Sequence, residues 1–492
     1  MRSELAELAG EPQGTADALP LCVDLDGTLL LTDAFYESLV AVLARDTLLA
    51  FRVPGWLGAG KARLKQELAE RWSFDPASLP YDERVVAYLR DQRAQGRRIV
   101  LSTATHRRIA ERIAAHLGLF DEVIATEGED NLRGPAKAAA LVRRFGKGGF
   151  VYVGNDATDE PVWEVAAAAV VVNAAPALQQ RAQARYRVLA VFEPPSGGRL
   201  RAALKAMRPY QWVKNALCLV PLFAAGAIGE AGAWMGALLL MAGFSLTASA
   251  IYIVNDLSDL AADRAHPRKR RRPFAAGTLP IPAGILLSAV LLLLGVALAA
   301  ASGALIFVAI YALASISYSM WLKEQPIVDV FMLALLYTIR LFGGGVASGH
   351  EVSLWLLGFS SFLFLSLALV KRVSEIDRHA RRGTEGFIAR RGYMAEDGAM
   401  LQMLGSAATF SSAIVLSLYV QSDVASRAYA NPGVLWGTIP LLLFWQCRLW
   451  LSTARGYMHD DPIVYAARDW VSWIVFACLA LVVVVAWTPS PL

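Results

Sequence analysis

Three carboxylates at helical spacing stand at the end of a long apolar run, where polar side chains are costly. They are Asp256, Asp259 and Asp263, at positions i, i+3 and i+7, and Asn255 precedes them. On a helix these positions line one face, and neighbouring carboxylates repel one another unless a cation neutralises them. Oxygen ligands suit Mg²⁺, which binds through a few carboxylates, water and the phosphates of a substrate. The pattern therefore predicts a Mg²⁺ site for a diphosphate, with all four residues as ligands.

A basic stretch follows at residues 264–272 and offers cations that could hold those phosphates. We take Arg264, Lys269 and Arg270 as its candidate phosphate ligands. Membrane topology is an alternative explanation, because the cytoplasmic loops of membrane proteins collect Lys and Arg. Topology accounts for the arginines but leaves the carboxylates unexplained. We therefore favour a membrane enzyme that handles a diphosphate.

A second set of polar side chains follows short apolar segments in the first 200 residues. The segments LCVDLDGTLL (21–30), RRIVLSTAT (97–105) and GGFVYVGNDATDEP (148–161) are typical of buried parallel strands, whose carboxyl ends form the sites of α/β domains. A lysine also begins the helical pattern GPAKAAALVRRFG between the last two. Together these side chains make a set suited to phosphoryl transfer. They are Asp24, Asp26, Thr103, Lys137, Asn155, Asp156 and Asp159.

All four motifs, in this order, resemble the haloacid dehalogenase (HAD) superfamily. The resemblance implies an α/β, Rossmann-like fold in which Asp24 attacks phosphorus and forms an aspartyl-phosphate. It implies that Asp26 protonates the leaving group and then activates water. It further implies that Thr103 and Lys137 hold the phosphoryl oxygens, and that Asp24 and Asp159 bind Mg²⁺.

The resemblance covers residues 21–191 and departs from the family in the last motif. Asn155 stands where an acidic residue is usual, and Asp156 follows with a charge that could replace it. Between the motifs, residues 32–95 contain helical patterns that predict a small helical cap over the site. The candidate metal ligands of this half are Asp24, Asp26, Asn155, Asp156 and Asp159.

Ionisable residues also gather at the ends of later apolar runs, where they are functional candidates by default. For each residue alone, snorkelling of a long side chain to the membrane interface is the simpler explanation. Because several fall on one predicted side of the membrane, we expect them to share a pocket with the three carboxylates. The candidates for substrate binding are Arg208, Lys214, Tyr318, Lys323, Lys371, Arg372, Asp377, Asp460 and Asp461, and Glu375 is a further candidate metal ligand.

The composition indicates a membrane protein with a soluble part. The chain has 492 residues, of which 56% are hydrophobic, and its mean hydropathy is +0.42. The net charge of +5 arises largely from basic loops beside apolar segments, and we recognise no nucleic-acid-binding module. Four widely separated cysteines form no CxxC pair, so we interpret them as small buried residues and not as disulfides or zinc ligands.

The apolar runs begin only after Trp212, which divides the chain into parts. We predict an N-terminal tail (1–19), a phosphatase-like domain (20–192), a linker (193–207) and an all-α polytopic membrane domain (208–492). The apolar segments of the last part suggest about nine spanning helices. The N-terminus resembles no secretory signal. We therefore expect a multi-pass protein of the cell inner (plasma) membrane, with its HAD domain in the cytoplasm.

The membrane half, residues 205–490, is similar to the UbiA superfamily of intramembrane transferases through its NDxxDxxxD pattern and its number of spans. The segments RPYQWVKN, WLKEQPIVDVF and RGYMHDDPIVYAARD look most like the decaprenyl-phosphate phosphoribosyltransferase branch. This resemblance implies transfer of phosphoribose from phosphoribosyl diphosphate to a polyprenyl phosphate, with Mg²⁺ as cofactor. Glu375, with Asp377, departs from the usual DxxxD-type second site. The fused HAD domain would remove a phosphate from the product lipid or from a related intermediate.

Other functions stay open on sequence grounds. A UbiA-type prenyltransferase would take a polyprenyl diphosphate as the donor and an aromatic ring as the acceptor, and it needs the same metal-bound diphosphate. A membrane-anchored HAD phosphatase would use its spans only as an anchor, which leaves the intramembrane carboxylates without a role. A transporter ranks last because no inverted repeat is evident. The donor that is consumed separates the two transferases.

Overall fold

The structure is a computed structural model that describes residues 18–127, 131–194, 198–381, 391–458 and 461–488. The chain forms two compact units. Unit 1 combines Met1–Ala206 with Ile253–Leu287, and unit 2 combines Met207–Tyr252 with Ser288–Leu492. Unit 1 therefore contains the predicted α/β domain together with the carboxylate motif and the basic stretch, and unit 2 contains most of the apolar helices.

A six-stranded parallel sheet forms the centre of unit 1. Its strands lie in the order β3-β2-β1-β4-β5-β6, and Leu21 of β1 lies opposite Ile99 of β2 and Val151 of β4. The chain winds outward in both directions from β1, so the carboxyl ends of β1 and β4 border the crevice in which such sheets bind ligands. The strands are β1 (Leu21–Val23), β2 (Ile99–His106), β3 (Glu122–Thr126), β4 (Val151–Gly154), β5 (Ala168–Val172) and β6 (Val188–Phe192).

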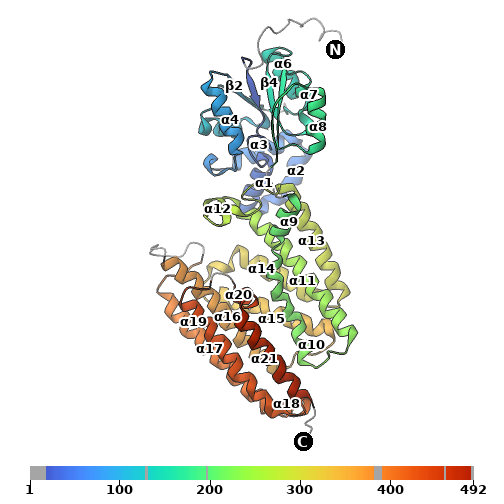
Figure 1. Ribbon diagram of the computed structural model, residues 1–492, viewed down its shortest axis with the longest axis vertical. Coiled ribbons are helices and arrows are strands. Elements are labelled where there is room, and N and C mark those ends of the chain that lie inside the picture. Colours follow the sequence, from blue (N-terminus) through green and yellow to red (C-terminus); the bar gives the residue numbers. More distant parts are fainter. Residues whose placement is uncertain (1–17, 128–130, 195–197, 382–390, 459–460, 489–492) are drawn as a thin grey trace. The chain divides into compact units, whose positions relative to one another are not determined.

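Helices cover both faces of this sheet, which explains why its strands are apolar on both sides. One face packs against α4 (Glu83–Ala94) and α5 (Arg107–Leu117), and the other packs against α6 (Pro135–Phe145) and α8 (Pro176–Arg185). Figure 1 shows α4 and α8 on opposite sides of the strands. Two short elements follow β4, namely η3 (Ala157–Asp159) and α7 (Glu160–Trp163).

A small helical cap lies between β1 and β2, as the sequence predicted. Asp33 caps the first helix, because its side chain accepts the backbone N–H of Phe35 at 2.8 Å. The helix α4 does not belong to the cap, since Val85, Val86 and Leu89 pack into the core of the sheet. The cap elements are α1 (Ala34–Arg45), η1 (Thr47–Phe51), α2 (Val53–Gly58) and α3 (Lys61–Arg71), and η2 (Pro76–Ser78) follows them.

The second stretch of unit 1 packs against the loop that follows the first motif. Gly277 has φ +68°, and a Cβ added there would lie 2.6 Å from Leu31 Cβ. The close approach and the left-handed backbone both require glycine at this position. The elements of this stretch are the end of α11 (Ala231–Ser258), α12 (Leu260–Ala265), η5 (Lys269–Arg271) and the start of α13 (Ile281–Ala301), and α9 (Arg199–Met207) ends the first stretch.

Seven helices of the described chain are long and apolar enough to cross a membrane, and α14 (Leu305–Met320) is a shorter apolar helix. The sequence predicted about nine spans. One difference arises near residues 213–229, where η4 (Pro209–Leu219) and α10 (Val220–Ala224) replace a single long helix; Pro221 lacks the N–H that a continuous helix needs. The candidate spans are α11, α13, α15 (Val328–Ser348), α16 (Leu354–Ala380), α17 (Asp397–Val420), Pro432–Ala454 and α21 (Trp470–Trp487).

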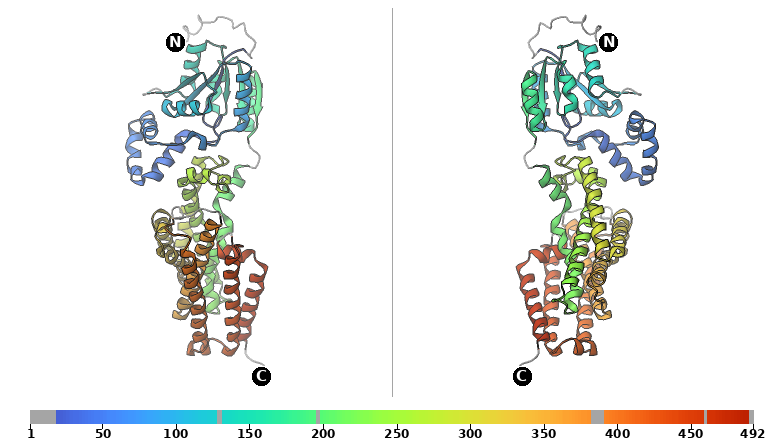
Figure 2. Two further views of the ribbon diagram at one scale, coloured as in Figure 1. Left: turned by 90° about the vertical axis from the view of Figure 1, so that its left-hand side faces the viewer. Right: turned by 90° about the vertical axis from the view of Figure 1, so that its right-hand side faces the viewer.

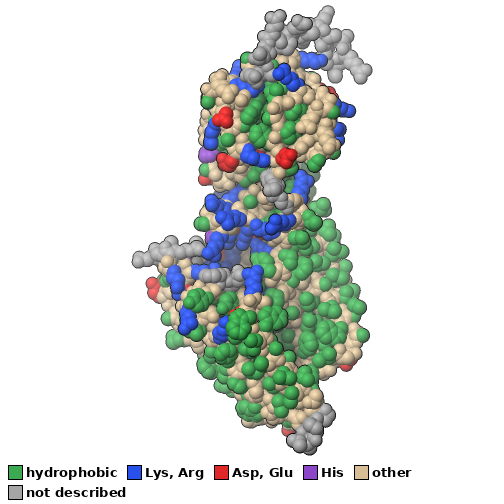
Figure 3. Space-filling model, viewed as in Figure 1, with side chains coloured by type: hydrophobic (Ala, Val, Ile, Leu, Met, Phe, Trp, Pro, Cys, Tyr) green, Lys and Arg blue, Asp and Glu red, His purple; other side chains and the backbone are tan. Residues whose placement is uncertain are grey.

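Figure 2 shows the long helices of unit 2 running side by side. The shorter elements are η6 (Leu322–Glu324), α18 (Asp423–Ala428), η7 (Pro432–Gly437), α19 (Thr438–Ala454) and α20 (Pro462–Arg468). Many apolar side chains of unit 2 face outward (Figure 3), with Leu293 70% and Leu313 69% exposed. Such exposure suits a helix that faces lipid. The same arrangement overturns part of the cysteine prediction, because Cys447 is exposed on α19, whereas Cys22 and Cys218 are buried.

Small residues let helices of unit 2 approach closely. A Cβ added to Gly344 of α15 would lie 2.2 Å from the carbonyl oxygen of Cys218 in η4. We expect Gly344→Ala to destabilise the protein by about 1–3 kcal/mol through overpacking, measured as a lower thermal midpoint in detergent. Gly358→Ala is the matched control, since its Cβ would meet only Val415 Cγ1 at 3.5 Å. Equal midpoints for both variants would contradict the prediction.

Candidate active sites

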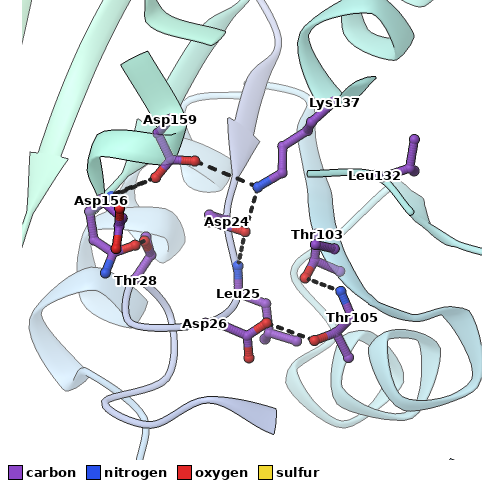
Figure 4. A network of polar contacts seen from close by, with 12 residues as sticks. Asp24, Leu25, Asp26, Thr28, Thr103, Thr105, Leu132, Lys137, Asp156 and Asp159 are labelled. Carbon is purple, nitrogen blue, oxygen red and sulfur yellow. Dashed lines mark hydrogen bonds and ion pairs between the residues drawn. The ribbon is translucent and has the colours of Figure 1, made fainter. Parts of the chain in front are cut away.

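The carboxyl ends of β1 and β4 bring the predicted phosphoryl-transfer residues together (Figure 4). Asp24 follows β1, and its backbone N–H donates to the carbonyl of Val153 at 3.0 Å, which holds it beside β4. Asp24 Oδ1 accepts the backbone N–H of Leu25 at 2.9 Å and lies 2.9 Å from Lys137 Nζ. Among the described residues, no hydrogen bond engages Oδ2. This oxygen is therefore the one that can attack a phosphorus atom.

Lys137 belongs to a buried polar network. Its Nζ donates to Tyr152 Oη at 2.7 Å, and Tyr152 Oη donates to Asp159 Oδ1 at 3.0 Å. Asp159 Oδ2 accepts the backbone N–H groups of Asn155 and Asp156 at 3.0 and 3.2 Å. The ammonium group and the carboxylate are thus held in place before a substrate binds, which is the condition for electrostatic stabilisation of a transition state.

Asp26 is positioned by two elements at once. Its Oδ1 accepts the backbone N–H of Ala34, at the start of α1, at 2.7 Å. Its Oδ2 accepts the hydroxyl of Thr105, at the end of β2, at 2.7 Å. Thr103 is fully buried, and its Oγ1 accepts the backbone N–H of Thr105 at 3.0 Å. The expected acid–base residue is therefore fixed by the cap and by the sheet together.

Asn155 lies directly against the first motif. Gly27 has φ +73°, and a Cβ added there would lie 2.2 Å from Asn155 Nδ2, so only glycine fits. Thr28 Oγ1 donates to Asn155 Oδ1 at 3.2 Å. Asp156 is exposed and caps η3 by accepting the backbone N–H of Thr158 at 3.0 Å. The amide of Asn155 is thus placed near the aspartates, while Asp156 has a capping role.

Burial controls the protonation of this site. Loss of water raises the pKa of Asp24 to about 7, with Lys137 opposing the shift and Asp159 reinforcing it. Burial also raises the pKa of Asp26 to about 7, and Asp33 reinforces it. Burial disfavours the charged form of Lys137, but Asp24 and Asp159 outweigh it and raise the pKa of Lys137. Asp26 can therefore both donate and accept a proton near neutral pH.

The oxygens of this site fit Mg²⁺. Asp24, Asp159 and Asn155 supply two carboxylates and an amide, and Mg²⁺ usually takes one or two carboxylates with water and substrate phosphates. In the described part of the chain, no three His, Cys, Asp or Glu side chains are grouped to hold a metal ion. Water and the phosphate of a substrate would complete the coordination of a cation bound here. A bound cation would also lower the pKa of Asp24 again.

Arg272 joins the first and last carboxylates of the second motif. Its Nη1 lies 3.0 Å from Asp256 Oδ1 and 2.6 Å from Asp263 Oδ2. The helix is interrupted at Asp259, but the N–H groups of Asp259 and Asp263 still bond to carbonyls four residues earlier, so the two carboxylates converge as predicted. Asp263 Oδ1 is buried and accepts no hydrogen bond from the described residues. A cation such as Mg²⁺ would satisfy this oxygen.

The basic stretch divides into exposed and buried parts. Lys269 and Arg270 are exposed, and Lys269 Nζ lies 3.9 Å from Asp263 Oδ1. Arg264 instead pairs with Glu37 of the cap helix α1, with nitrogen–oxygen distances of 3.0 and 2.6 Å, and both side chains are buried. In this structure the guanidinium of Arg264 is therefore paired with a carboxylate and not placed to bind a phosphate. Phosphate binding by Lys269 and Arg270 stays a prediction.

We expect Arg264→Ala to destabilise unit 1 by about 3 kcal/mol, because it leaves the buried charge of Glu37 without its partner. Among the described residues, Glu37 would keep the hydrogen bond from the hydroxyl of Thr32, at 2.8 Å. Hydrogen exchange of the α1 amides would measure the loss as faster exchange. Arg268→Ala, at an exposed position of the same stretch, is the control. Unchanged protection of α1 in Arg264→Ala would refute the expectation.

In unit 2, two lysines and a tyrosine lie around the carboxylate of Asp461. Asp461 Oδ2 lies 2.7 Å from Lys214 Nζ and 3.6 Å from Lys371 Nζ, and it accepts the hydroxyl of Tyr337 at 3.1 Å. Lys214 and Asp461 are buried. Among the described residues, one carboxylate faces two ammonium groups, so the cluster has positive charge available for an anion such as a phosphate.

A second charged cluster of unit 2 surrounds Arg372. Arg372 is buried and pairs with Asp329 and Glu375. Arg391 lies 3.3 Å from the carboxylate of Glu375, and Tyr318 Oη accepts hydrogen bonds from Arg372 at 3.3 Å and from Arg391 at 3.1 Å. Two arginines face two carboxylates, so this cluster is closer to neutral than the one around Asp461. Glu375, a predicted metal ligand, is engaged by both arginines.

Three further predicted residues lie in or beside η4, η6 and α16. Arg208 directly precedes η4, and its guanidinium lies 5.1 Å from the centre of the Tyr252 ring. Lys323 is half-buried in η6, and Asp377 is half-buried in α16. Asp460 lies outside the described residues. The structure therefore brings together Lys214, Lys371 and Asp461, and separately Tyr318, Arg372 and Glu375.

An apolar cavity of about 660 Å³ lies among the helices of unit 2. Its lining includes Val213 and Ile463, which neighbour Lys214 and Asp461 in the sequence. The rest of the lining is mainly aliphatic and aromatic, with Leu217, Phe364, Trp445 and Phe476 as examples. A cavity of this composition suits a hydrocarbon chain.

The matches to known families cover both parts of the chain. Residues 21–171 match the haloacid dehalogenase-like hydrolase model, and residues 216–457 match the UbiA prenyltransferase family model. The chain belongs to the UbiA prenyltransferase family. A haloacid dehalogenase-like hydrolase domain is fused to its N-terminal side. This UbiA fusion protein therefore joins two enzyme families in one chain.

Three curated relatives illustrate what the UbiA fusion protein is similar to. The uncharacterized protein y4nM of Sinorhizobium fredii is 34% identical over 95% of this chain and 91% of that protein. Nodulation protein NoeC of Azorhizobium caulinodans is 32% identical over 56% of this chain and 90% of that protein. Decaprenyl-phosphate phosphoribosyltransferase of Corynebacterium glutamicum is 37% identical over 37% of this chain, and the match spans 57% of that protein.

The structure of this UbiA fusion protein also places residues at both sites that sequence reasoning missed. Thr105 bonds to Asp26, and Tyr152 joins Lys137 to Asp159. Tyr337 bonds to Asp461 in unit 2. Tyr152 occupies an apolar strand and resembles an ordinary core residue, so its sequence context carried no signal. Thr105 follows Thr103 by two residues, and the period of a strand could have indicated it.

Proposed function

We propose that the UbiA fusion protein is a Mg²⁺-dependent membrane transferase that moves 5-phosphoribose from phosphoribosyl diphosphate to a polyprenyl phosphate. The main support is the apolar cavity, because its lining residue Ile463 donates its backbone N–H to Asp461, which forms the positively charged cluster with Lys214 and Lys371. A lipid phosphate has the matching chemistry, since its chain suits the cavity and its head suits the lysines. The match to decaprenyl-phosphate phosphoribosyltransferases over part of the chain supports phosphoribose as the transferred group and a polyprenyl phosphate as the acceptor.

The transfer step exchanges one bond for another at the anomeric carbon. An oxygen of the polyprenyl phosphate attacks C1 of the phosphoribosyl group, and the bond between C1 and the diphosphate oxygen breaks. Mg²⁺, where bound, would neutralise the leaving diphosphate. Asp256 and Asp263, with Asp259 and Asn255 as further candidates, would hold the cation, and Lys269 and Arg270 would hold the phosphates.

We assign the HAD domain a phosphomonoesterase reaction on a phosphate of the same pathway. Asp24 attacks phosphorus and the ester bond breaks, while Asp26 gives its proton to the departing alcohol. A water molecule then attacks the aspartyl-phosphate and returns a proton to Asp26, which releases inorganic phosphate and Asp24. Lys137 and Thr103 stabilise the phosphoryl oxygens during both steps.

The distribution of basic residues supports a membrane topology for the proposed enzyme. Basic residues concentrate in residues 264–272, within unit 1, which also holds the HAD domain. Because cytoplasmic loops of membrane proteins are enriched in Lys and Arg, we place the HAD domain on the cytoplasmic side of the cell inner membrane. Phosphoribosyl diphosphate is a charged, soluble donor, so the same side gives the transferase access to it.

The deciding experiment identifies the donor. The purified full-length protein in detergent with Mg²⁺ is given polyprenyl phosphate and radiolabelled phosphoribosyl diphosphate. We expect label in the lipid fraction, with release of diphosphate. The alternative is a prenyltransferase, which the name of the matching family favours. Turnover of a polyprenyl diphosphate with an aromatic acid, without label in the lipid, would identify the protein as a prenyltransferase instead.

A further inference from the structure

The phosphatase site opens into a cavity that is larger than a simple phosphate ester needs. Its volume is about 1,490 Å³, whereas small-molecule sites usually measure roughly 300–1,000 Å³. Asp24 and Asp26 are among its lining residues. The other parts of the lining come from the cap, from the helix α9 and from residues 277–282, all of them within unit 1. The cavity therefore extends well beyond the reacting groups.

Two walls of this cavity differ in chemistry. The cap contributes mainly apolar side chains, among them Phe35, Leu39 and Leu57, together with Lys61 and Lys65 of α3. The helix α9 contributes three cations, Arg199, Arg201 and Lys205, all of them exposed to the cavity or to solvent. Lys205 Nζ donates to the carbonyl of Arg271 at 2.8 Å, which ties α9 to the basic stretch. Hydrolysis of a phosphate at Asp24 uses none of these cations, because Lys137 already serves that centre.

The cavity also adjoins a candidate membrane span. Residues 277–282 line it, and Ile281 is the first residue of α13, a helix of mean hydropathy 2.6 that is long enough to cross a membrane. A molecule anchored in a bilayer beside α13 could therefore extend its polar head into the cavity without leaving the membrane. A soluble substrate would gain nothing from such a position.

We propose that Arg199, Arg201 and Lys205 form a second anion site of the phosphatase, which binds the phosphodiester of a membrane-anchored substrate while its phosphomonoester reaches Asp24. The inference rests on the proposed hydrolase function and adds the substrate class and the residues that select it. A lipid-linked sugar with one phosphodiester and one terminal phosphomonoester has this chemistry. The product of the proposed transfer step is a molecule of that class.

The test compares two substrates on the full-length protein in neutral detergent. One is a polyprenyl phosphodiester of ribose 5-phosphate, and the other is ribose 5-phosphate alone; release of inorganic phosphate is measured for both. For Arg199→Gln/Arg201→Gln we expect KM for the lipid-linked substrate to rise about tenfold, because two charge-assisted contacts are lost. We expect kcat for the lipid-linked substrate to stay unchanged. We also expect KM and kcat for ribose 5-phosphate to stay unchanged.

A charge-matched control is Arg143→Gln/Lys147→Gln, at exposed positions outside the cavity lining. Equal changes for both substrates, or no change for either, would overturn the second anion site while leaving the hydrolase function intact. Absence of phosphate release from every substrate by wild type would overturn the hydrolase function and the inference with it.

The arginines could instead bind anionic headgroups of the membrane. The same assay is therefore repeated in vesicles of phosphatidylcholine alone and of phosphatidylcholine with phosphatidylglycerol. A substrate-specific rise in KM that is present in both vesicles supports the inference. A defect that appears only with phosphatidylglycerol would overturn it, because the arginines would then serve the lipid surface.

Discussion

Replacing Asp24 with Asn is expected to lower phosphate release roughly 10,000-fold, while transfer of phosphoribose to the lipid continues at the wild-type rate. The amide has the shape of the carboxylate but no negative charge, so it cannot attack phosphorus. Lys137 keeps its hydrogen bond to Tyr152 and its charge pairing with Asp159 at 3.6 Å. The fold of the site should therefore survive, so the loss of phosphate release would reflect the missing nucleophile and not unfolding.

The measurement follows both reactions in one preparation. Labelled phosphoribosyl diphosphate reports the transfer step, and inorganic phosphate reports the hydrolytic step. Asp91→Asn, at an exposed position of α4, is the matched control. Persistent phosphate release in Asp24→Asn would show that this residue is not the nucleophile. A parallel loss of transfer would show that the two reactions depend on each other.

The second large effect concerns the carboxylate motif. We expect Asp256→Asn and Asp263→Asn each to reduce lipid labelling by roughly 100- to 1,000-fold, the range found when one electrostatic stabiliser of a transition state is removed. Asp263 matters because its buried Oδ1 has no hydrogen-bond donor among the described residues and its Oδ2 lies 2.6 Å from Arg272. Either change would weaken the hold on a cation that neutralises the leaving diphosphate.

A Mg²⁺ titration distinguishes a binding defect from a folding defect. A weakened metal site should shift the half-saturating Mg²⁺ concentration upward, whereas a misfolded protein should lose activity at every concentration. Glu351→Gln, at an exposed carboxylate, is the control. Wild-type labelling in Asp256→Asn and Asp263→Asn would reduce the motif to a structural role and would favour a membrane-anchored phosphatase.

Local sequence patterns predicted much of the fold of this protein and of its candidate sites. The apolar strands β1, β2 and β4 each lead into a polar motif, and the rule that parallel strands present their carboxyl ends to one edge placed Asp24 and Asp159 in one site, to which the helix α6 adds Lys137. The spacing of Asp256 and Asp263 predicted that they converge, because a helix repeats every 3.6 residues. The long apolar runs likewise predicted a multi-pass membrane protein, because a span needs about 20 such residues.

Only the tertiary structure decided which distant residues meet. Arg264 and Glu37 are separated by 227 positions, and no local spacing relates them. Tyr152 resembles a core residue until Lys137 and Asp159 pack around it. The walls of the phosphatase cavity likewise depended on the packing of Gly277 against Leu31, in the loop that follows the first motif. Periodicity specifies the faces of helices and strands, whereas their partners follow from how those faces pack in three dimensions.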